Sequence, residues 1–151
     1  MKVTNLEAIK KTLAKKDATD IWFRLEAIIE ALEQTAMENG TLGQETLETE
    51  YTNNRTGKRE RIVLDLVKPA VYDLDEDGDI ISTIEEETYR IREIVVGKET
   101  VYKSTNITAD ELAEITGKSK AWIYKLAQRF DRMPTIEEIE QTKPAGRPRK
   151  Y

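Results

Sequence analysis

The 151-residue chain contains no cysteine and no histidine. Without cysteine the chain cannot form a disulfide framework, a thiolate metal site or a thiol nucleophile. Without histidine it lacks the most common general base and the most common metal ligand, which also excludes a Ser-His triad. Catalysis would therefore depend on carboxylates or lysine, and the sequence contains no paired constellation of such groups. We expect a protein that is not an enzyme and that uses neither a cofactor nor a metal ion.

Long apolar runs are absent as well. No segment approaches the ~20 apolar residues that a membrane-spanning helix needs. The first residues, MKVTNLEAIKK, lack the apolar core of a signal peptide. We therefore expect a soluble protein without a membrane partner, located in the cytoplasm of a bacterial or infected host cell.

Charge is unevenly distributed along the chain, although the net charge is only −5. Residues 103–151 contain ten Lys/Arg against seven Asp/Glu, which gives this end a net charge of +3. Residues 1–102 contain fourteen against twenty-two, which gives the rest a net charge of −8. The basic end favours contact with nucleic acid, whereas the acidic part must point away from a bound duplex.

The segment Thr108–Phe130 predicts two short helices joined by a tight turn. Thr108 and Glu111 have the spacing of a capping box at the start of the first helix. Gly117 follows where a left-handed residue ends a helix, and Ser119 can cap the second helix. Apolar residues recur at helical spacing on both helices. They are Leu112, Ala113 and Ile115 on the first helix, and Trp122, Ile123, Leu126, Ala127 and Phe130 on the second.

This spacing resembles the helix-turn-helix of DNA-binding regulators. Taking Ala109 as the first position, the fifth is the small Ala113, which permits close approach of the helices, and the ninth is Gly117, which makes the sharp turn. The tenth position is usually apolar, and Lys118 departs from this pattern. An ordinary pair of packed helices is the alternative interpretation. The resemblance implies that the second helix enters the major groove. The side chains that it would present to DNA are Lys118, Ser119, Lys120, Tyr124, Lys125, Gln128 and Arg129.

The chain ends in the basic segment KPAGRPRKY. Gly146-Arg147-Pro148 resembles the core of an AT-hook, which lies in the minor groove of A·T-rich DNA with an arginine on each side. Ala145 replaces one of these arginines, so the resemblance is partial. The alternative is a basic tail that contacts phosphates without sequence preference. Both interpretations add three candidate DNA-binding residues: Arg147, Arg149 and Lys150.

Two helices are predicted at the beginning of the chain. Residues 3–16 place apolar side chains opposite a row of lysines. A second helix follows, capped by Asp17 or Thr19 and ended by Asn39-Gly40. The apolar stripe of this helix predicts packing in the core or, alternatively, pairing with a second copy of the chain. The stripe consists of Ile21, Leu25, Ile28, Ile29 and Leu32.

Between Thr41 and Lys103 alternating apolar residues predict an antiparallel sheet of about four strands. Hairpin turns are expected at Asn53–Lys58, where Gly57 can supply a positive φ, and at Gly97-Lys98.

The acidic segment Asp73–Ile80 begins like an EF-hand calcium loop, with oxygen ligands at alternate positions and then a glycine. Its twelfth position is Ile84 where the closing carboxylate should stand, and no helix precedes it. We therefore interpret the segment as an acidic turn between strands without a tight calcium site. The run Glu85-Glu86-Glu87 is interpreted as a solvated turn or the start of a strand.

These patterns predict an α+β fold with N-terminal helices, a small antiparallel sheet, a C-terminal helix-turn-helix and a basic tail. We expect a domain at 1–103 that dimerises or binds a partner, a helix-turn-helix domain at 104–142 and a flexible tail at 143–151. The resemblance implies a transcriptional regulator of a phage or mobile element that binds double-stranded DNA, with a homodimer expected. The alternative is an interaction module or inhibitor that binds a host protein through the acidic region 1–102.

Overall fold

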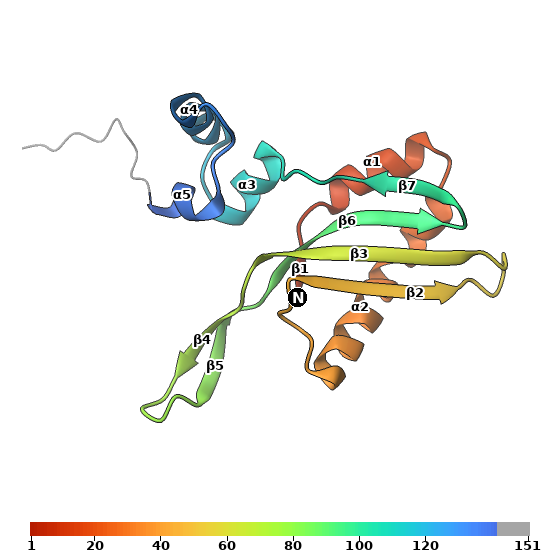
Figure 1. Cartoon of the computed structure of the whole chain (residues 1–151), viewed down its shortest axis with the longest axis horizontal. Coiled ribbons are helices and arrows are strands. Elements are labelled where there is room, and N and C mark those ends of the chain that lie inside the picture. Colours follow the sequence, from red (N-terminus) through yellow and green to blue (C-terminus); the bar gives the residue numbers. More distant parts are fainter. Residues whose placement is uncertain (142–151) are drawn as a thin grey trace, which may run out of the picture. The chain divides into compact units, whose positions relative to one another are not determined.

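The computed structural model describes residues 1–141 and shows an α+β fold with both helices and sheets (Figure 1). The chain divides into two compact units, Met1–Thr105 and a second unit from Asn106 onward. The basic segment 143–151, with its partial AT-hook resemblance and the candidates Arg147, Arg149 and Lys150, lies outside the described residues. No helix within residues 1–141 is both long enough and apolar enough to cross a bilayer.

The first unit contains a five-stranded sheet, a separate two-stranded hairpin and two helices. Strand β6 is central, because β3 pairs antiparallel along one of its edges while β1 and β7 pair with opposite ends of its other edge. Strand β2 pairs antiparallel with β3. The elements are β1 (Lys2–Val3), α1 (Leu6–Lys15), α2 (Thr19–Asn39), β2 (Thr46–Thr52), β3 (Arg59–Lys68), β4 (Val71–Leu74), β5 (Ile80–Glu85), β6 (Thr88–Val96) and β7 (Glu99–Lys103).

The core of the first unit lies between α1, α2 and one face of the five-stranded sheet. The predicted stripe on α2 belongs to this core, since Ile21, Leu25 and Leu32 are at most 7% exposed. Ile28 and Ile29 are partly buried against the same cluster. The expectation of core packing is therefore confirmed.

The beginning of the chain differs from the predicted helix over residues 3–16. Residues Lys2 and Val3 form β1, which pairs parallel with the start of β6, and the helix begins only at Leu6. The predicted caps of α2 are also wrong, because Ala18 occupies the N-cap position and makes no side-chain cap hydrogen bond. The predicted end of α2 is confirmed, since Gly40 is left-handed with a φ of 68°.

The sequence predicted a sheet of about four strands. Its two hairpins are confirmed, but the prediction lacks other strands. The turns at Asn53–Lys58 and Gly97-Lys98 join β2 to β3 and β6 to β7. The parallel strand β1 is missing from the prediction. Strands β4 and β5 form a sheet of their own, a two-stranded hairpin that projects beyond the ends of β3 and β6 (Figure 1).

The acidic segment forms the turn of this hairpin, as predicted. The Asp75 carboxylate accepts hydrogen bonds from the backbone N–H groups of Asp77 and Asp79, at 2.9 and 2.8 Å. Within residues 1–141 no cluster of three or more Asp or Glu side chains is arranged to hold a metal ion. The solvated interpretation is wrong for Glu87, which is 7% exposed, and its backbone carbonyl accepts a hydrogen bond from the N–H of Lys2 at 2.8 Å where β1 joins the sheet.

The second unit contains α3 (Ala109–Thr116), α4 (Lys120–Phe130) and α5 (Ile136–Gln141). The capping box predicted at Thr108 and Glu111 is present, and Gly117 is left-handed with a φ of 74°. The Ser119 hydroxyl accepts a hydrogen bond from the backbone N–H of Trp122 at 3.1 Å and caps α4. These three helices enclose a small core of their own. It consists of Ala109, Leu112, Ile123, Leu126 and Ile139.

Candidate functional site

The exposed face of α4 is the surface that the sequence singled out. Ile123 and Leu126 are fully buried against α3 and α5, so the opposite side of α4 faces solvent. This helix contains no acidic residue and carries three cationic side chains. Of the seven predicted contact residues, six are exposed and Lys118 is half-buried. The exposed six are Ser119, Lys120, Tyr124, Lys125, Gln128 and Arg129.

The cations of α4 differ in their surroundings. The Lys120 ammonium lies 2.9 Å from the carboxylate of Asp110 on α3, and this hydrogen-bonded pairing raises the pKa of Lys120. Lys125 and Arg129 have no charged or hydrogen-bonding partner among the described residues. An exposed ion pair contributes little to stability, so Lys120 can leave Asp110 for a stronger anion such as a phosphate.

A shallow hollow of about 390 Å³ lies on α4 and is lined by Trp122, Lys125, Gln128 and Arg129. Trp122 is half-buried against the second core, and its indole N–H is buried without a hydrogen-bond partner within residues 1–141. The hollow therefore combines an aromatic wall with three donors. Such donors match the oxygen atoms of phosphates and the acceptors on base edges.

The C-terminal end of α4 is fixed to α5 by Arg132. Its guanidinium donates to both carboxylate oxygens of Glu138 at 2.7 Å and lies 5.3 Å from the centre of the Phe130 ring. Hydrogen bonds from Arg132, and then from the backbone of Thr135, lower the pKa of Glu138 to about 2. Sequence analysis did not single out Arg132. Its charge is already matched by Glu138, so we assign it the role of holding α4 in place.

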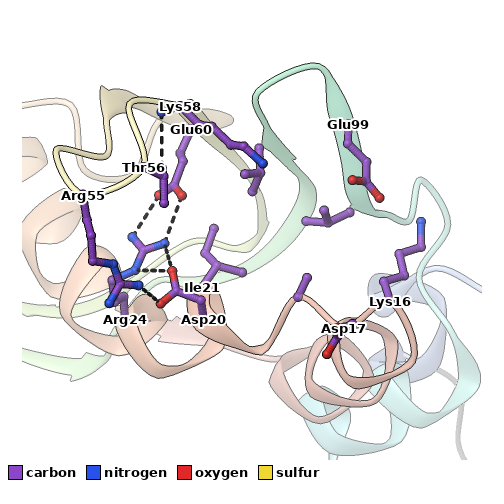
Figure 2. A pocket seen from close by; sticks show the side chains of 13 residues that line it. Lys16, Asp17, Asp20, Ile21, Arg24, Arg55, Thr56, Lys58, Glu60 and Glu99 are labelled. Atoms are coloured by element: carbon purple, nitrogen blue, oxygen red, sulfur yellow. Dashed lines mark hydrogen bonds and ion pairs between the residues drawn. The ribbon is translucent and has the colours of Figure 1, made fainter.

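A second candidate site, which sequence analysis missed, is a charged pocket in the first unit. It has a volume of about 320 Å³ and lies between the start of α2, the turn joining β2 to β3, and β7 (Figure 2). Arg24 and Glu60 occupy one wall, and Lys16 and Glu99 lie on the opposite wall (Figure 2). The pocket therefore contains both cations and carboxylates.

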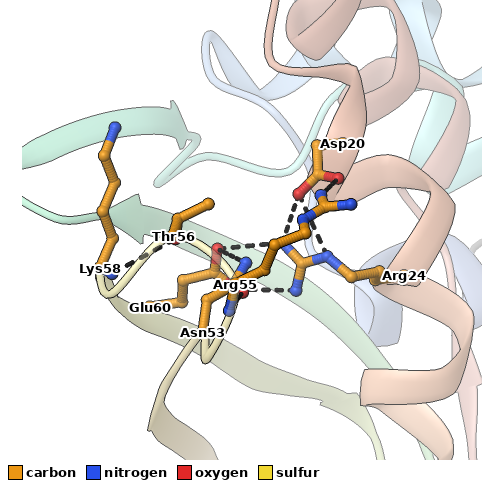
Figure 3. Close-up of polar contacts among 7 residues, drawn as sticks. All are labelled: Asp20, Arg24, Asn53, Arg55, Thr56, Lys58 and Glu60. Carbon is orange, nitrogen blue, oxygen red and sulfur yellow. Dashed lines mark hydrogen bonds and ion pairs between the residues drawn. The ribbon is translucent and has the colours of Figure 1, made fainter.

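Arg24 and Glu60 form the centre of the charged network in this pocket (Figure 3). The Arg24 guanidinium donates to both oxygens of Glu60 at 2.9 Å, and to Asp20 at 3.0 and 3.2 Å. From the β2–β3 turn, Asn53 donates to Glu60 at 3.3 Å and Arg55 donates to Asp20. The network thus joins the first turn of α2 to a hairpin more than 30 residues away.

The ionisation of this network does not favour acid–base catalysis at neutral pH. Burial raises the pKa of Glu60, but hydrogen bonds from Arg24 and Asn53 favour the ionised carboxylate, and the net pKa is lowered. Burial, and then the nearby Glu60 carboxylate, raise the pKa of Tyr51 to about 12. A general acid or base works best with a pKa near the ambient pH, and neither group meets that condition. We therefore assign the network a structural role.

Comparison with protein-family models, with curated proteins and with solved structures found no match to this chain.

Proposed function

We propose that this protein binds double-stranded DNA, with α3 and α4 acting as a helix-turn-helix and α4 entering the major groove. The observation that supports this most is the face of α4 opposite Ile123 and Leu126. That face exposes cations and neutral donors and has no acidic side chain of its own. The capped, left-handed turn at Gly117 supports the proposal as well, since it gives the two helices the sharp connection that the motif requires.

The residues of α4 divide into two roles under this proposal. Lys120, Lys125 and Arg129 are long cations that contact phosphates and fix the position of the helix. Tyr124 and Gln128 are exposed one turn apart on α4, and we assign them to base edges, which a recognition helix reaches in the major groove. Gln128 can pair with an adenine through two hydrogen bonds, and such a pair discriminates by about 1–3 kcal/mol.

The basic segment 143–151 extends this proposal. Lys143, Arg147, Arg149 and Lys150 would follow a DNA strand or enter the minor groove, which adds affinity through counterion release. The acidic first unit would then point away from the duplex. With these features, we propose a transcriptional regulator of a phage or mobile element that acts in the cytoplasm. A host-protein inhibitor that uses region 1–102 is the competing proposal.

The decisive experiment is selection of bound duplexes from a random pool with the full chain, followed by binding curves over a salt series. We expect Lys125→Ala and Arg129→Ala each to weaken binding to a selected and a random duplex alike. Each should reduce the slope of log affinity against log salt by about one unit. Gln128→Ala should weaken binding to the selected duplex more than binding to the random duplex.

Lys11→Ala is the matched control, because Lys11 is an exposed lysine on α1 in the acidic unit. It should leave both affinity and salt slope unchanged. If the wild-type chain binds neither duplex at low salt, DNA binding is refuted and the protein-interaction proposal replaces it.

A further inference from the structure

Exposed apolar side chains are concentrated on the hairpin formed by β4 and β5, Val71–Glu85, which we call the arm. Six large apolar residues of the arm are between 40% and 63% exposed. They are Val71, Tyr72, Leu74, Ile80, Ile81 and Ile84. Four further large apolar side chains in residues 1–141 are exposed, and they are dispersed over α2, α4 and the segment after α4. A patch of this density on a monomer indicates an interaction surface.

The arm receives no strand pairing from the rest of the described chain, and contacts such as the Lys68–Glu85 ion pair at 3.6 Å lie at its base. Within residues 1–141 its strands pair only with each other, and every residue of both strands is exposed. An isolated two-stranded hairpin is marginally stable in water, and its outer edges present unpaired N–H and C=O groups. A further strand along either edge would satisfy these groups, and a second arm packed on one face would cover the apolar side chains of that face.

We propose that the arm is a dimerisation element, which packs antiparallel against the arm of a second copy of this chain. The apolar stripe of α2 packs largely in the core of the first unit, whereas the apolar side chains of the arm are exposed. Identical arms related by a two-fold axis form a closed interface that cannot continue into a filament. The arm lies outside α4, so dimerisation through the arm does not depend on DNA binding.

The charge of the arm selects the antiparallel arrangement. Residues 69–89 contain no lysine or arginine, and five acidic residues lie at or beside the tip. They are Asp73, Asp75, Glu76, Asp77 and Asp79. At the base of the arm, Lys68 lies 3.6 Å from Glu85 and the Met1 ammonium lies 2.6 Å from Glu86. The negative charge is therefore concentrated at one end, while acidic groups at the other end have cationic partners.

In a parallel pair the two acidic tips would lie side by side and repel each other. In an antiparallel pair they are separated by about 20 Å, the length of a six-residue strand. That separation exceeds the screening length of about 8 Å at physiological ionic strength. Each tip then lies beside the neutralised base of the other arm. The same charge distribution keeps the arm away from DNA phosphates.

The available area is sufficient for a modest dimer. About half of the surface of six large apolar side chains offers several hundred Å² on each copy. Because neighbouring side chains of a strand point to opposite faces, two arms would together bury on the order of 500–1,000 Å², which is the size of a weak interface. We therefore expect a dimer with micromolar affinity rather than an obligate one.

Sedimentation velocity of the full chain without DNA tests the proposal. We expect wild type to shift from monomer to dimer between about 1 and 200 µM, the range around a micromolar dissociation constant. The double variant Ile81→Glu/Ile84→Glu introduces a carboxylate on each face of the arm, and it should dimerise at least about tenfold more weakly, because the carboxylate on the contact face would have to be buried. Phe23→Glu is the matched control and should dimerise as wild type does, since Phe23 is an 81% exposed apolar residue on α2.

Circular dichroism establishes that each variant retains the fold. A wild-type chain that is monomeric throughout this range overturns the proposal and leaves the arm to a partner of different sequence. A dimer that the arm variant leaves intact, or that Phe23→Glu disrupts, also overturns it.

Spin labels test the orientation of the two arms. Because the chain has no native cysteine, Ser82→Cys in the middle of β5 and Asp77→Cys at the tip each introduce a single labelling site. Antiparallel arms predict a shorter distance between the two labels at residue 82 than between the two labels at residue 77. The opposite order, measured by electron–electron double resonance, would exclude the antiparallel arrangement.

Discussion

The side chain of Asn5 pairs with both backbone groups of Ile91 in the middle of β6. Its amide oxygen accepts from the Ile91 N–H at 2.9 Å, and its amide nitrogen donates to the Ile91 carbonyl at 2.7 Å. Strands β1 and β7 share the edge of β6 that Asn5 contacts. The hydrogen-bonded pairing with β1 ends at Tyr89, and the pairing with β7 begins at Glu93. Asn5 therefore replaces the missing strand at the gap, and the hydroxyl of Tyr102 accepts a further hydrogen bond from it at 3.0 Å.

We expect Asn5→Ala to lower the free energy of unfolding by about 2–4 kcal/mol, since it leaves buried N–H and C=O groups without partners. Asn39→Ala is the matched control, because Asn39 is exposed at the end of α2 and should change stability by less than about 0.5 kcal/mol. Urea unfolding followed by fluorescence of Trp22, in the same unit, measures both. Equal effects of the two substitutions would contradict the strand-replacing role of Asn5.

A second prediction concerns the pH dependence of stability through Glu60. The pKa of Glu60 is lower in the folded state than its ordinary value of 4.5, so folding favours the ionised carboxylate. Its contribution is therefore present above pH 4.5 and is lost as the pH falls through the folded-state pKa. We expect Glu60→Gln to be less stable than wild type by about 1–3 kcal/mol at pH 7.

The stability difference between wild type and Glu60→Gln should shrink as the pH falls below 4.5, where the wild-type carboxylate becomes protonated. Urea titrations at pH 7, 5, 4 and 3 measure this difference directly. Glu50→Gln serves as the comparison, since Glu50 is an exposed carboxylate on β2 that pairs with Arg59 at 3.0 Å. A difference that is constant over the whole pH range would show that Glu60 contributes by packing and not by charge.

In the second unit, Leu126 and Trp122 should respond differently to truncation. Leu126 is fully buried, so Leu126→Ala should destabilise α3, α4 and α5 by about 2–5 kcal/mol. Trp122→Phe should lower the stability of the same helices by less than about 1 kcal/mol, because it removes a buried indole N–H that has no hydrogen-bond partner in residues 1–141. Hydrogen exchange of segment 109–130 reports these local stabilities. A large loss of protection in Trp122→Phe would indicate that its N–H is hydrogen-bonded in solution.

If α4 binds DNA, Asp110→Asn should strengthen binding on the order of threefold, because it removes a like charge and frees Lys120 from its ion pair. Glu114→Gln is the control, since it removes the same charge from an exposed position on α3 where no lysine is paired. Fluorescence anisotropy at one fixed salt concentration compares the two. Equal gains would mean that the overall charge of α3 matters and the Lys120–Asp110 pair does not.

Features encoded by neighbouring residues were predictable from the sequence. The capping box at Thr108, the left-handed turns at Gly40 and Gly117, and the two hairpin turns each depend on residues within a few positions of one another. Periodicity likewise indicated that Ile123 and Leu126 are buried, and therefore which face of α4 is exposed.

Features that depend on distant residues were not predictable in this way. Asn5 contacts Ile91 across 86 positions, and Arg24 contacts Glu60 across 36, so no local pattern connects either pair. Strand β1 has only two residues, which is too short to show an alternating pattern. The arm was also missed as a separate sheet, because its short strands, VYDL and IISTIE, show no regular alternation of apolar and polar residues.

The two apolar cores have no residue in common: one draws only on residues before Thr105 and the other only on residues after Asn106. The internal packing of α3, α4 and α5 can therefore evolve without repacking the sheet. A recombination event at residues 105–106 would exchange one complete core for another. The two units could therefore derive from different ancestral proteins.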